Sequence, residues 1–422
     1  MKEDFLHYIW KFKKFPEKDL ITDNGERIAI ISLGQHNLHS GPDFLNAQLR
    51  INDLHWVGNV EIHEKSSFWY AHNHENDPAY SNVILHVVWE HDIDVFNKNN
   101  EAIPTLALKN IVHSETLLSY NQLLYGNQKF INCEKQLEAI PSFFIDRWMG
   151  RLYIDRLQEK SEFIIRELQQ CKNDWESILF KMLLRNFGLK INGEAFFEIS
   201  NKLPFLVIRK NSTSNFTLET LLFGVAGMLN DESVSQYYIS LKKEYKYLEK
   251  KYTLEQSTLA PEYFKLRPYN FPTIRLSQLA ALYSKETNLF QQLMECDKLE
   301  GYYKIFEVSA SNYWDSHYTF NKESPSKREK KTSKQFINLL IVNTIIPLKF
   351  CYGNYKGKDA TEEVLNLIGG IKKEKNSIVE SFENIGFDVK SALGSQSLLQ
   401  LYNEYCSENK CLHCEIGVKL IR

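Results

Sequence analysis

The spacing of apolar residues changes about a quarter of the way along this 422-residue chain. Before about residue 110, apolar and β-branched residues occur in short runs that turns separate, and Asn82–Glu90 is the clearest of these runs. From about Ser114 onward, apolar residues recur at spacings of three and four over long stretches. Because strands and helices need different periods, the sequence predicts a sheet-containing first part and a larger helical second part.

The predicted first domain covers residues 1–113 and is an α+β domain, with one amphipathic helix at residues 4–13 and a mainly antiparallel sheet. Its strands are expected at residues 27–33, 43–51, 54–63, 82–90 and 105–108. The second region covers residues 114–422 and is predicted to be mostly α-helical. Its helices are expected at residues 142–168, 174–187, 218–228, 233–252, 276–293, 334–346, 359–367 and 377–383.

Composition sets few limits on function. A net charge of −2 and a hydrophobic content of 43% are ordinary for a soluble globular protein and neither require nor exclude nucleic acid. The chain starts Met1-Lys2-Glu3-Asp4 without an apolar signal segment, and the longest apolar run, residues 336–348, is interrupted by polar residues. We therefore expect a cytoplasmic protein with no membrane partner, whose oligomeric state the sequence leaves open.

Histidines are concentrated near the N-terminus. Eight of the twelve lie between His36 and His91. Imidazole and carboxylate groups bind divalent metals and transfer protons near neutral pH, so this segment is the expected location of any chemistry.

Asp43, Glu61 and His63 form the first candidate site in this segment. Asp43 follows Pro42 at the start of one predicted strand, and Glu61 and His63 share one face of the next strand because successive side chains alternate. A hairpin of these strands would bring Asp43 beside Glu61. Two carboxylates so placed suit Mg²⁺ or Mn²⁺, and His63 could assist proton transfer to or from an attacking water.

His72 and His74 form a rival candidate together with Asp77. A His-x-His pair with a carboxylate can bind Zn²⁺ and leave an open position for water. In the nuclease interpretation the same three residues contact substrate instead, together with His36 and His39. The alternative for each single histidine is a hydrogen-bonded structural role, which we assign to His55 and His91.

Three late cysteines are the second chemical signal. Cys406, Cys411 and Cys414 are spaced C-x4-C-x2-C, and Cys133 is the expected fourth ligand, with His413 and Cys351 as alternatives. This spacing predicts a Zn²⁺ site, or less favourably an iron–sulfur cluster. Reduced thiols without a metal are the competing interpretation.

Arg267 and Arg275 flank two prolines and could contact phosphate, as could the basic stretch Lys327–Lys334. The simpler interpretation is that the two arginines stabilise helix ends or form ion pairs, and that the basic stretch is a solvated loop.

Pro42-Asp43 and Glu61-Ile62-His63, preceded by a helix, resemble the PD-(D/E)XK nuclease superfamily over roughly residues 1–110. In that superfamily a helix precedes a β-meander, Pro-Asp opens one strand, and an acidic-x-Lys triplet lies on the next. The resemblance implies a metal-dependent nuclease or an inactive relative. His63 stands where the superfamily has Lys, and His does not keep a constant positive charge at neutral pH.

Longer motifs resemble the bacterial domain-of-unknown-function 2851 family. They are residues 34–44, 58–67, 69–74, 77–80, 82–89, 266–276 and 411–417. This resemblance implies a cytoplasmic bacterial protein and supplies no activity.

Three functions therefore remain open. The first is a metal-dependent phosphodiesterase acting on nucleic acid, or an inactive relative. The second is a non-catalytic binding protein, and the third is a zinc hydrolase that uses His72 and His74.

Overall fold

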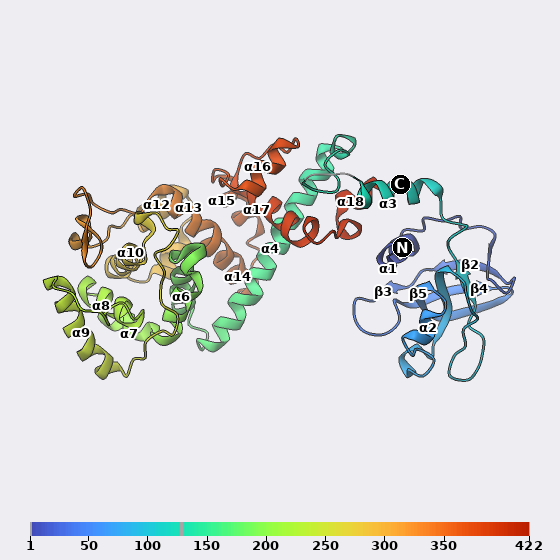
Figure 1. Ribbon diagram of the computed structural model, residues 1–422, viewed down its shortest axis with the longest axis horizontal. Helices are drawn as coiled ribbons and strands as arrows, with labels where there is room; N and C mark the ends of the chain where they lie inside the picture. Colours follow the sequence, from blue (N-terminus) through green and yellow to red (C-terminus); the bar gives the residue numbers. More distant parts are fainter. Residues whose placement is uncertain (1, 127–129, 422) are drawn as a thin grey trace. The chain divides into compact units, whose positions relative to one another are not determined.

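The computed structural model describes residues 2–126 and 130–421. The chain forms two compact units, one of residues 1–148 with 401–422 and one of residues 149–400 (Figure 1). The sequence had placed the boundary after residue 113. It lies later because α3 (Ser114–Tyr125) buries Tyr120 and Leu123 in the core of the first unit, where they meet Ile421.

A seven-stranded sheet forms the centre of the first unit, in the order β1-β2-β4-β5-β6-β7 with β3 paired to β4. Its strands are β1 (Leu20–Ile21), β2 (Arg27–Ser32), β3 (Gln35–His36), β4 (Phe44–Ile51), β5 (Leu54–Lys65), β6 (Val83–Glu90) and β7 (Thr105–Ala107). The pairs from β1 to β5 are antiparallel, whereas β6 runs parallel to β5, and β7 parallel to β6. The sheet is therefore mixed.

The two ends of the sheet approach each other. The backbone N–H of Asp23, just after β1, donates to the carbonyl of Thr105 in β7 at 3.0 Å, so the sheet is a nearly closed barrel. With the helical second unit, this arrangement confirms the predicted fold class, an α+β part followed by a mostly helical region.

Strand alternation in β5 divides its side chains between two environments. Val60 and Ile62 are fully buried in the core on one face, where α1 (Glu3–Lys11) packs with Phe5, Ile9 and other apolar residues. Glu61 and His63 therefore lie on the other face, as the sequence predicted.

A short connection between β5 and β6 contains α2 (Phe68–Ala71) and the 3-10 turn η1 (Pro78–Tyr80). Trp69 of α2 is fully buried against Val83, Val95 and Ile103, which form a small separate core. This packing fixes the segment that carries His72 and His74.

The second unit is helical and contains a small hairpin, β8 (His317–Thr319) and β9 (Lys322–Glu323). Its elements are α4 (Ser142–Gln170, which begins in the first unit), α5 (Trp175–Phe187), α6 (Leu189–Lys202), α7 (Phe205–Asn211), α8 (Asn215–Val225), α9 (Gln236–Tyr252), η3 (Pro268–Asn270), α10 (Pro272–Lys285), α11 (Leu289–Glu295), α12 (Leu299–Phe306), η4 (Asn312–Asp315), α13 (Lys334–Leu340), η5 (Ile341–Ile345), α14 (Ile346–Tyr355), α15 (Thr361–Gly369), α16 (Ser377–Asn384) and α17 (Ala392–Leu401).

Two helical predictions differ in extent from the structure. The helix expected at residues 276–293 is two helices, α10 and α11, because Asn288 adopts a left-handed φ of 56° between them. The helix expected at residues 334–346 continues to Tyr355 through the π-helical segment η5. This run, Lys334–Tyr355, is long and apolar enough to cross a membrane, and 72% of its most apolar window is buried inside the structure, as in a core helix.

The end of the chain returns to the first unit through η6 (Tyr402–Cys406), η7 (Cys411–His413) and α18 (Glu415–Leu420). The hydroxyl of Tyr8 in α1 donates to the carbonyl of Ile421 at 2.9 Å. The first unit therefore consists of two segments that are distant in the sequence.

We predict that Trp10→Ala destabilises the protein by about 3–5 kcal/mol, because Trp10 is fully buried and its indole N–H donates to the Leu33 carbonyl. Leu38→Ala is the control, since Leu38 is exposed, and it should change stability by less than about 0.5 kcal/mol. Urea denaturation followed by circular dichroism measures both. Equal stability of the two variants would contradict the assigned core.

Candidate metal centre

Asp43 and Glu61 lie side by side because β4 and β5 pair with Phe44 opposite Val60. The backbone N–H of Asp43 donates to Glu61 Oε2 at 3.2 Å, and the N–H of Ile62 donates to Asp43 Oδ2 at 2.9 Å. The hairpin expected from the sequence thus brings the two carboxylates together. Glu61 is buried and Asp43 is partly exposed.

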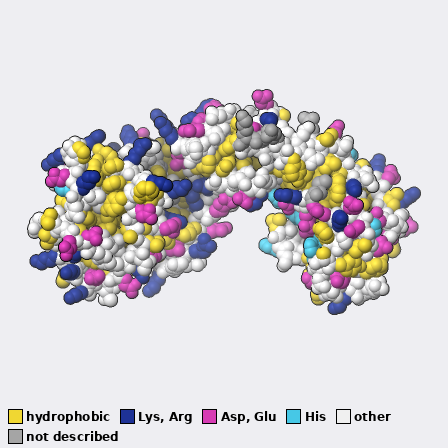
Figure 2. Space-filling view, in the orientation of Figure 1, with side chains coloured by type: hydrophobic (Ala, Val, Ile, Leu, Met, Phe, Trp, Pro, Cys, Tyr) yellow, Lys and Arg dark blue, Asp and Glu magenta, His cyan; other side chains and the backbone are white. Residues whose placement is uncertain are grey.

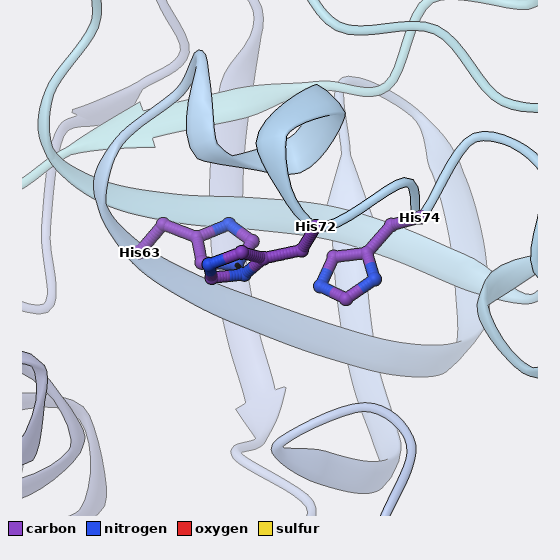
Figure 3. A group of neighbouring side chains, drawn as sticks. All are labelled: His63, His72 and His74. Carbon is purple, nitrogen blue, oxygen red and sulfur yellow. Dashed lines mark hydrogen bonds between the residues drawn. The ribbon is translucent and has the colours of Figure 1, made fainter.

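Two histidines contact the same carboxylate, and a third histidine contacts one of them. Glu61 Oε1 lies 3.2 Å from Nε2 of His74 and 3.5 Å from Nε2 of His63. Nε2 of His63 lies 3.1 Å from Nδ1 of His72. One ligand nitrogen from each histidine falls within 4.8 Å of the others, close enough for one metal ion. Figure 3 shows His63, which comes from β5, beside His72 and His74 from the segment that follows α2.

His86 contacts this group through a hydrogen bond with His63. It lies on β6 opposite Glu61 in the parallel register, is fully buried, and its Nε2 is 2.8 Å from Nδ1 of His63. When Nδ1 of His63 carries the proton and donates it to His86, Nε2 of His63 presents a lone pair to a metal. In that tautomer His86 would orient a candidate ligand, a role that the sequence did not indicate.

Burial strongly shifts the pKa values of Glu61, His63 and His86. Burial, and next the charge of Asp43, raise the pKa of Glu61 to about 9. Burial and the neighbouring His86 lower the pKa of His63 to about 2, and burial lowers the pKa of His86 to about 3. Burial also lowers the pKa of His74. The lowered pKa values of His63, His74 and His86 favour their neutral form at neutral pH, which is the form with a lone pair available to bind a metal.

A second group lies on the other side of Glu61. Glu3, His7 and Asp43 place one ligand atom each within 4.8 Å of one another, and His7 Nε2 is 3.2 Å from Asp43 Oδ2. Burial lowers the pKa of His7, but the hydrogen bond and charge of Asp43 outweigh it, so the pKa is raised overall. Glu3 and His7 were not among the residues predicted from the sequence. Their spacing of four residues in an amphipathic helix, which places both on one helix face, was the available signal.

Glu61 connects the two groups. Its Oε1 faces His63 and His74, whereas its Oε2 accepts the hydrogen bond from Asp43. Figure 2 shows histidine side chains gathered on the first unit, and His72 is exposed, so the His63–His72–His74 group opens to solvent at that residue.

The remaining candidates in this segment lie outside both groups. His36 stacks on the ring of Phe44, with ring centroids 4.8 Å apart, and approaches His7. His39 is exposed on a loop. Asp77 is exposed and caps η1 by accepting from the N–H of Ala79, so the expected His72–His74–Asp77 set is replaced by one in which Glu61 supplies the carboxylate.

The two arginines belong to the helical unit. Arg275 is buried, its guanidinium lies 3.4 Å from the ring centre of Phe336, and it donates to Gln278 and Asn270. Burial lowers the pKa of Arg275 to about 9. These contacts give Arg275 a structural role, whereas Arg267 is exposed at the start of η3. Lys330, in the basic stretch that was expected to be solvated, is buried and donates to the Asp315 carbonyl.

A cavity of about 1000 Å³ lies in the helical unit. Its wall includes Lys242, Lys243 and Lys246 of α9 with the stacked rings of Tyr313 and His317. It has no group of three close metal-binding side chains among the residues that the structure describes. Both groups of three close metal-binding side chains found among the described residues lie in the first unit.

Comparison with known proteins adds a family but no activity. The model of a family described as "Protein of unknown function (DUF2851)" matches residues 3–377. No curated protein and no solved structure matches the chain.

The raised pKa of Glu61 predicts how stability depends on pH in metal-free protein. The folded protein keeps the Glu61 proton up to about pH 9, whereas the unfolded chain releases it near 4.5, so this group makes stability fall as pH rises from 7 to 9. The lowered pKa values of His63 and His86 act oppositely, and make stability fall as pH drops below 6.5. Thermal melts of chelator-treated protein should show both effects.

Glu61→Gln is the matched variant for this measurement, because it keeps the side-chain volume and cannot titrate. We expect its melting temperature to fall less than that of the wild type between pH 7 and pH 9. Parallel curves for the two proteins over this range would contradict the proposed protonation of Glu61.

Proposed function

We propose that this chain, which belongs to the DUF2851 family, is a metal-dependent hydrolase that cleaves phosphodiesters in nucleic acid. The single observation that carries the proposal is the convergence of ligand nitrogens of His63, His72 and His74. Glu61 Oε1 faces two of these histidines, His63 and His74. Three imidazoles and a carboxylate, buried on one side and open at His72, have the composition of a catalytic metal site.

The donor set favours a different metal from the one that the sequence suggested. Asp43 and Glu61 alone would suit Mg²⁺ or Mn²⁺, since both ions prefer oxygen ligands. Three added imidazole nitrogens shift the preference toward Zn²⁺, with Mn²⁺ as the next candidate. A divalent ion held there would polarise a phosphate oxygen and lower the pKa of water.

The protein's own groups have separate tasks in this proposal. Glu61, His63, His72 and His74 hold the ion, and His86 orients His63 through its hydrogen bond. His7 lies against Asp43 with a raised pKa, so it can donate a proton to a leaving oxygen. Asp43 holds both His7 and the backbone of Ile62 in place.

The proposal of a phosphodiester substrate rests on the order of the elements and on the positions of the two motifs. Helix α1 precedes the antiparallel strands β2, β4 and β5, Pro42-Asp43 opens β4, and Glu61-Ile62-His63 lies on β5. This is the order of elements that the resemblance to the PD-(D/E)XK nuclease superfamily implies. His63 is neutral at physiological pH and does not replace the charge of the usual Lys. The metal and His7 would therefore supply positive charge at the phosphate.

A zinc hydrolase acting on a different ester or on a peptide is the second candidate. The convergence of His72 and His74 favours it equally, because the metal site is the same. The two candidates differ only in substrate, which the same assay decides.

To test the proposal, the full chain is stripped of metal, and Zn²⁺, Mn²⁺ or Mg²⁺ is added back in separate reactions. The substrates are labelled single- and double-stranded DNA, RNA, a peptide library and a simple carboxylic ester. We expect Zn²⁺ or Mn²⁺ to support nucleic-acid cleavage. Glu61→Gln and His74→Ala should each lower the rate about 100-fold or more through loss of metal.

His113→Asn is the control, because His113 is exposed and lies outside both ligand groups. It should keep wild-type activity. Cleavage of the peptide or carboxylic ester instead of nucleic acid would favour the second candidate. Metal binding without cleavage of any substrate would favour a non-catalytic binding protein, and full activity of Glu61→Gln would refute the site.

A further inference from the structure

The last three cysteines lie on consecutive short elements of the C-terminal segment. Cys406 ends η6, Cys411 begins η7, and Cys414 immediately precedes α18. The turn between the first two is closed by backbone hydrogen bonds from Asn409 to Cys406 and from Lys410 to Tyr405. The C-x4-C-x2-C spacing is therefore folded into one compact loop.

Cys133 joins this loop from a distant part of the chain. Its neighbour Asn132 donates from Nδ2 to Asn409 Oδ1 at 3.0 Å and to the sulfur of Cys411 at 3.4 Å. Phe130 stacks on Tyr402, with ring centroids 5.4 Å apart. The Cys133 thiol is near enough to Cys411 and Cys414 for electrostatic interaction, and Cys406 interacts in the same way with the other three.

The loop leaves no space for a side chain at position 417. A Cβ atom at Gly417 would lie 2.1 Å from the carbonyl oxygen of Cys411, so only glycine allows α18 to pack this closely. The close packing brings backbone amides of Ile416 and Gly417 into hydrogen-bonding range of the Cys414 sulfur. Burial nevertheless raises the pKa of the Cys414 thiol overall, so the thiolate that binds a metal would form as the metal displaces the proton.

All seven cysteines of the chain are free thiols, so no disulfide links the four that interact electrostatically. No three of these four sulfur atoms, all in the described part of the chain, lie within 4.8 Å of one another, so a single Zn²⁺ ion would draw them closer, whereas an iron–sulfur cluster would span a wider set. We propose that Cys133, Cys406, Cys411 and Cys414 form a four-thiolate site for a thiophilic metal centre, either one Zn²⁺ ion or an iron–sulfur cluster. Both centres are bound by four cysteine thiolates, and both match the spacing.

This site is independent of the hydrolase proposal and has a structural consequence. Three of its ligands belong to the segment that starts at Leu401, and the fourth belongs to the segment before Trp148. A metal centre here would fasten the end of the chain to the first unit and contribute directly to its folding.

The test begins with full-length protein purified under reducing conditions without chelator, and measures zinc, iron and acid-labile sulfide. Glu61→Gln is analysed in parallel, so that metal at the histidine group is counted separately. We expect one equivalent of zinc, or iron with matching sulfide and visible absorption, that Glu61→Gln retains. Cys133→Ser should lose it, whereas Cys171→Ser, a free thiol of the helical unit, should keep it.

Cobalt substitution of the wild type keeps the test decisive if Cys133→Ser fails to fold. Sulfur-to-cobalt charge-transfer absorption with the intensity of four thiolates would support a zinc-type site, and iron with sulfide in the purified protein would support the cluster. Two results would overturn the proposal. One is purified protein that contains neither zinc nor iron and shows no thiolate–cobalt absorption, and the other is a Cys133→Ser variant that retains the full metal content.

Discussion

The pairing of Asp43 with Glu61 across β4 and β5 is the interaction on which the candidate site depends. One carboxylate is buried and the other partly exposed, and each accepts a backbone N–H from the opposite strand. The same register places Val60 and Ile62 in the core beneath α1. The packing of the apolar face thus fixes the position of the polar face, and a shift of the register by one residue would bury the wrong set of side chains.

Around this pair the fold assembles groups from four separate elements. Helix α1 contributes Glu3 and His7, β5 contributes His63, and the segment after α2 contributes His72 and His74. His86 comes from β6, which reaches Glu61 because it runs parallel to β5. A buried carboxylate beside neutral imidazoles is costly without a compensating cation, so metal-free protein keeps Glu61 protonated, and a bound cation would favour its charged form.

Local patterns predicted much of this arrangement. Alternation in β5 and the short β4–β5 turn were enough to place Asp43, Glu61 and His63 together, because both depend on residues that are close in sequence. The contribution of His86 depends on a parallel strand pairing, which has no local signal. The spacing of Glu3 and His7 places both on one face of α1 but does not show which strand residues that face contacts. Arg275 shows the same limit, since only the packed helices reveal that Phe336 covers it.

The central claim is that one metal ion binds between Glu61 and the three histidines. Crystals of the full chain soaked in Zn²⁺ or Mn²⁺, with diffraction recorded on both sides of the metal absorption edge, measure this directly. The account predicts an anomalous peak within bonding distance of Glu61 Oε1, the Nε2 atoms of His63 and His74, and His72. A saturated crystal with no peak at this position, or with a peak only at the cysteines, would contradict it.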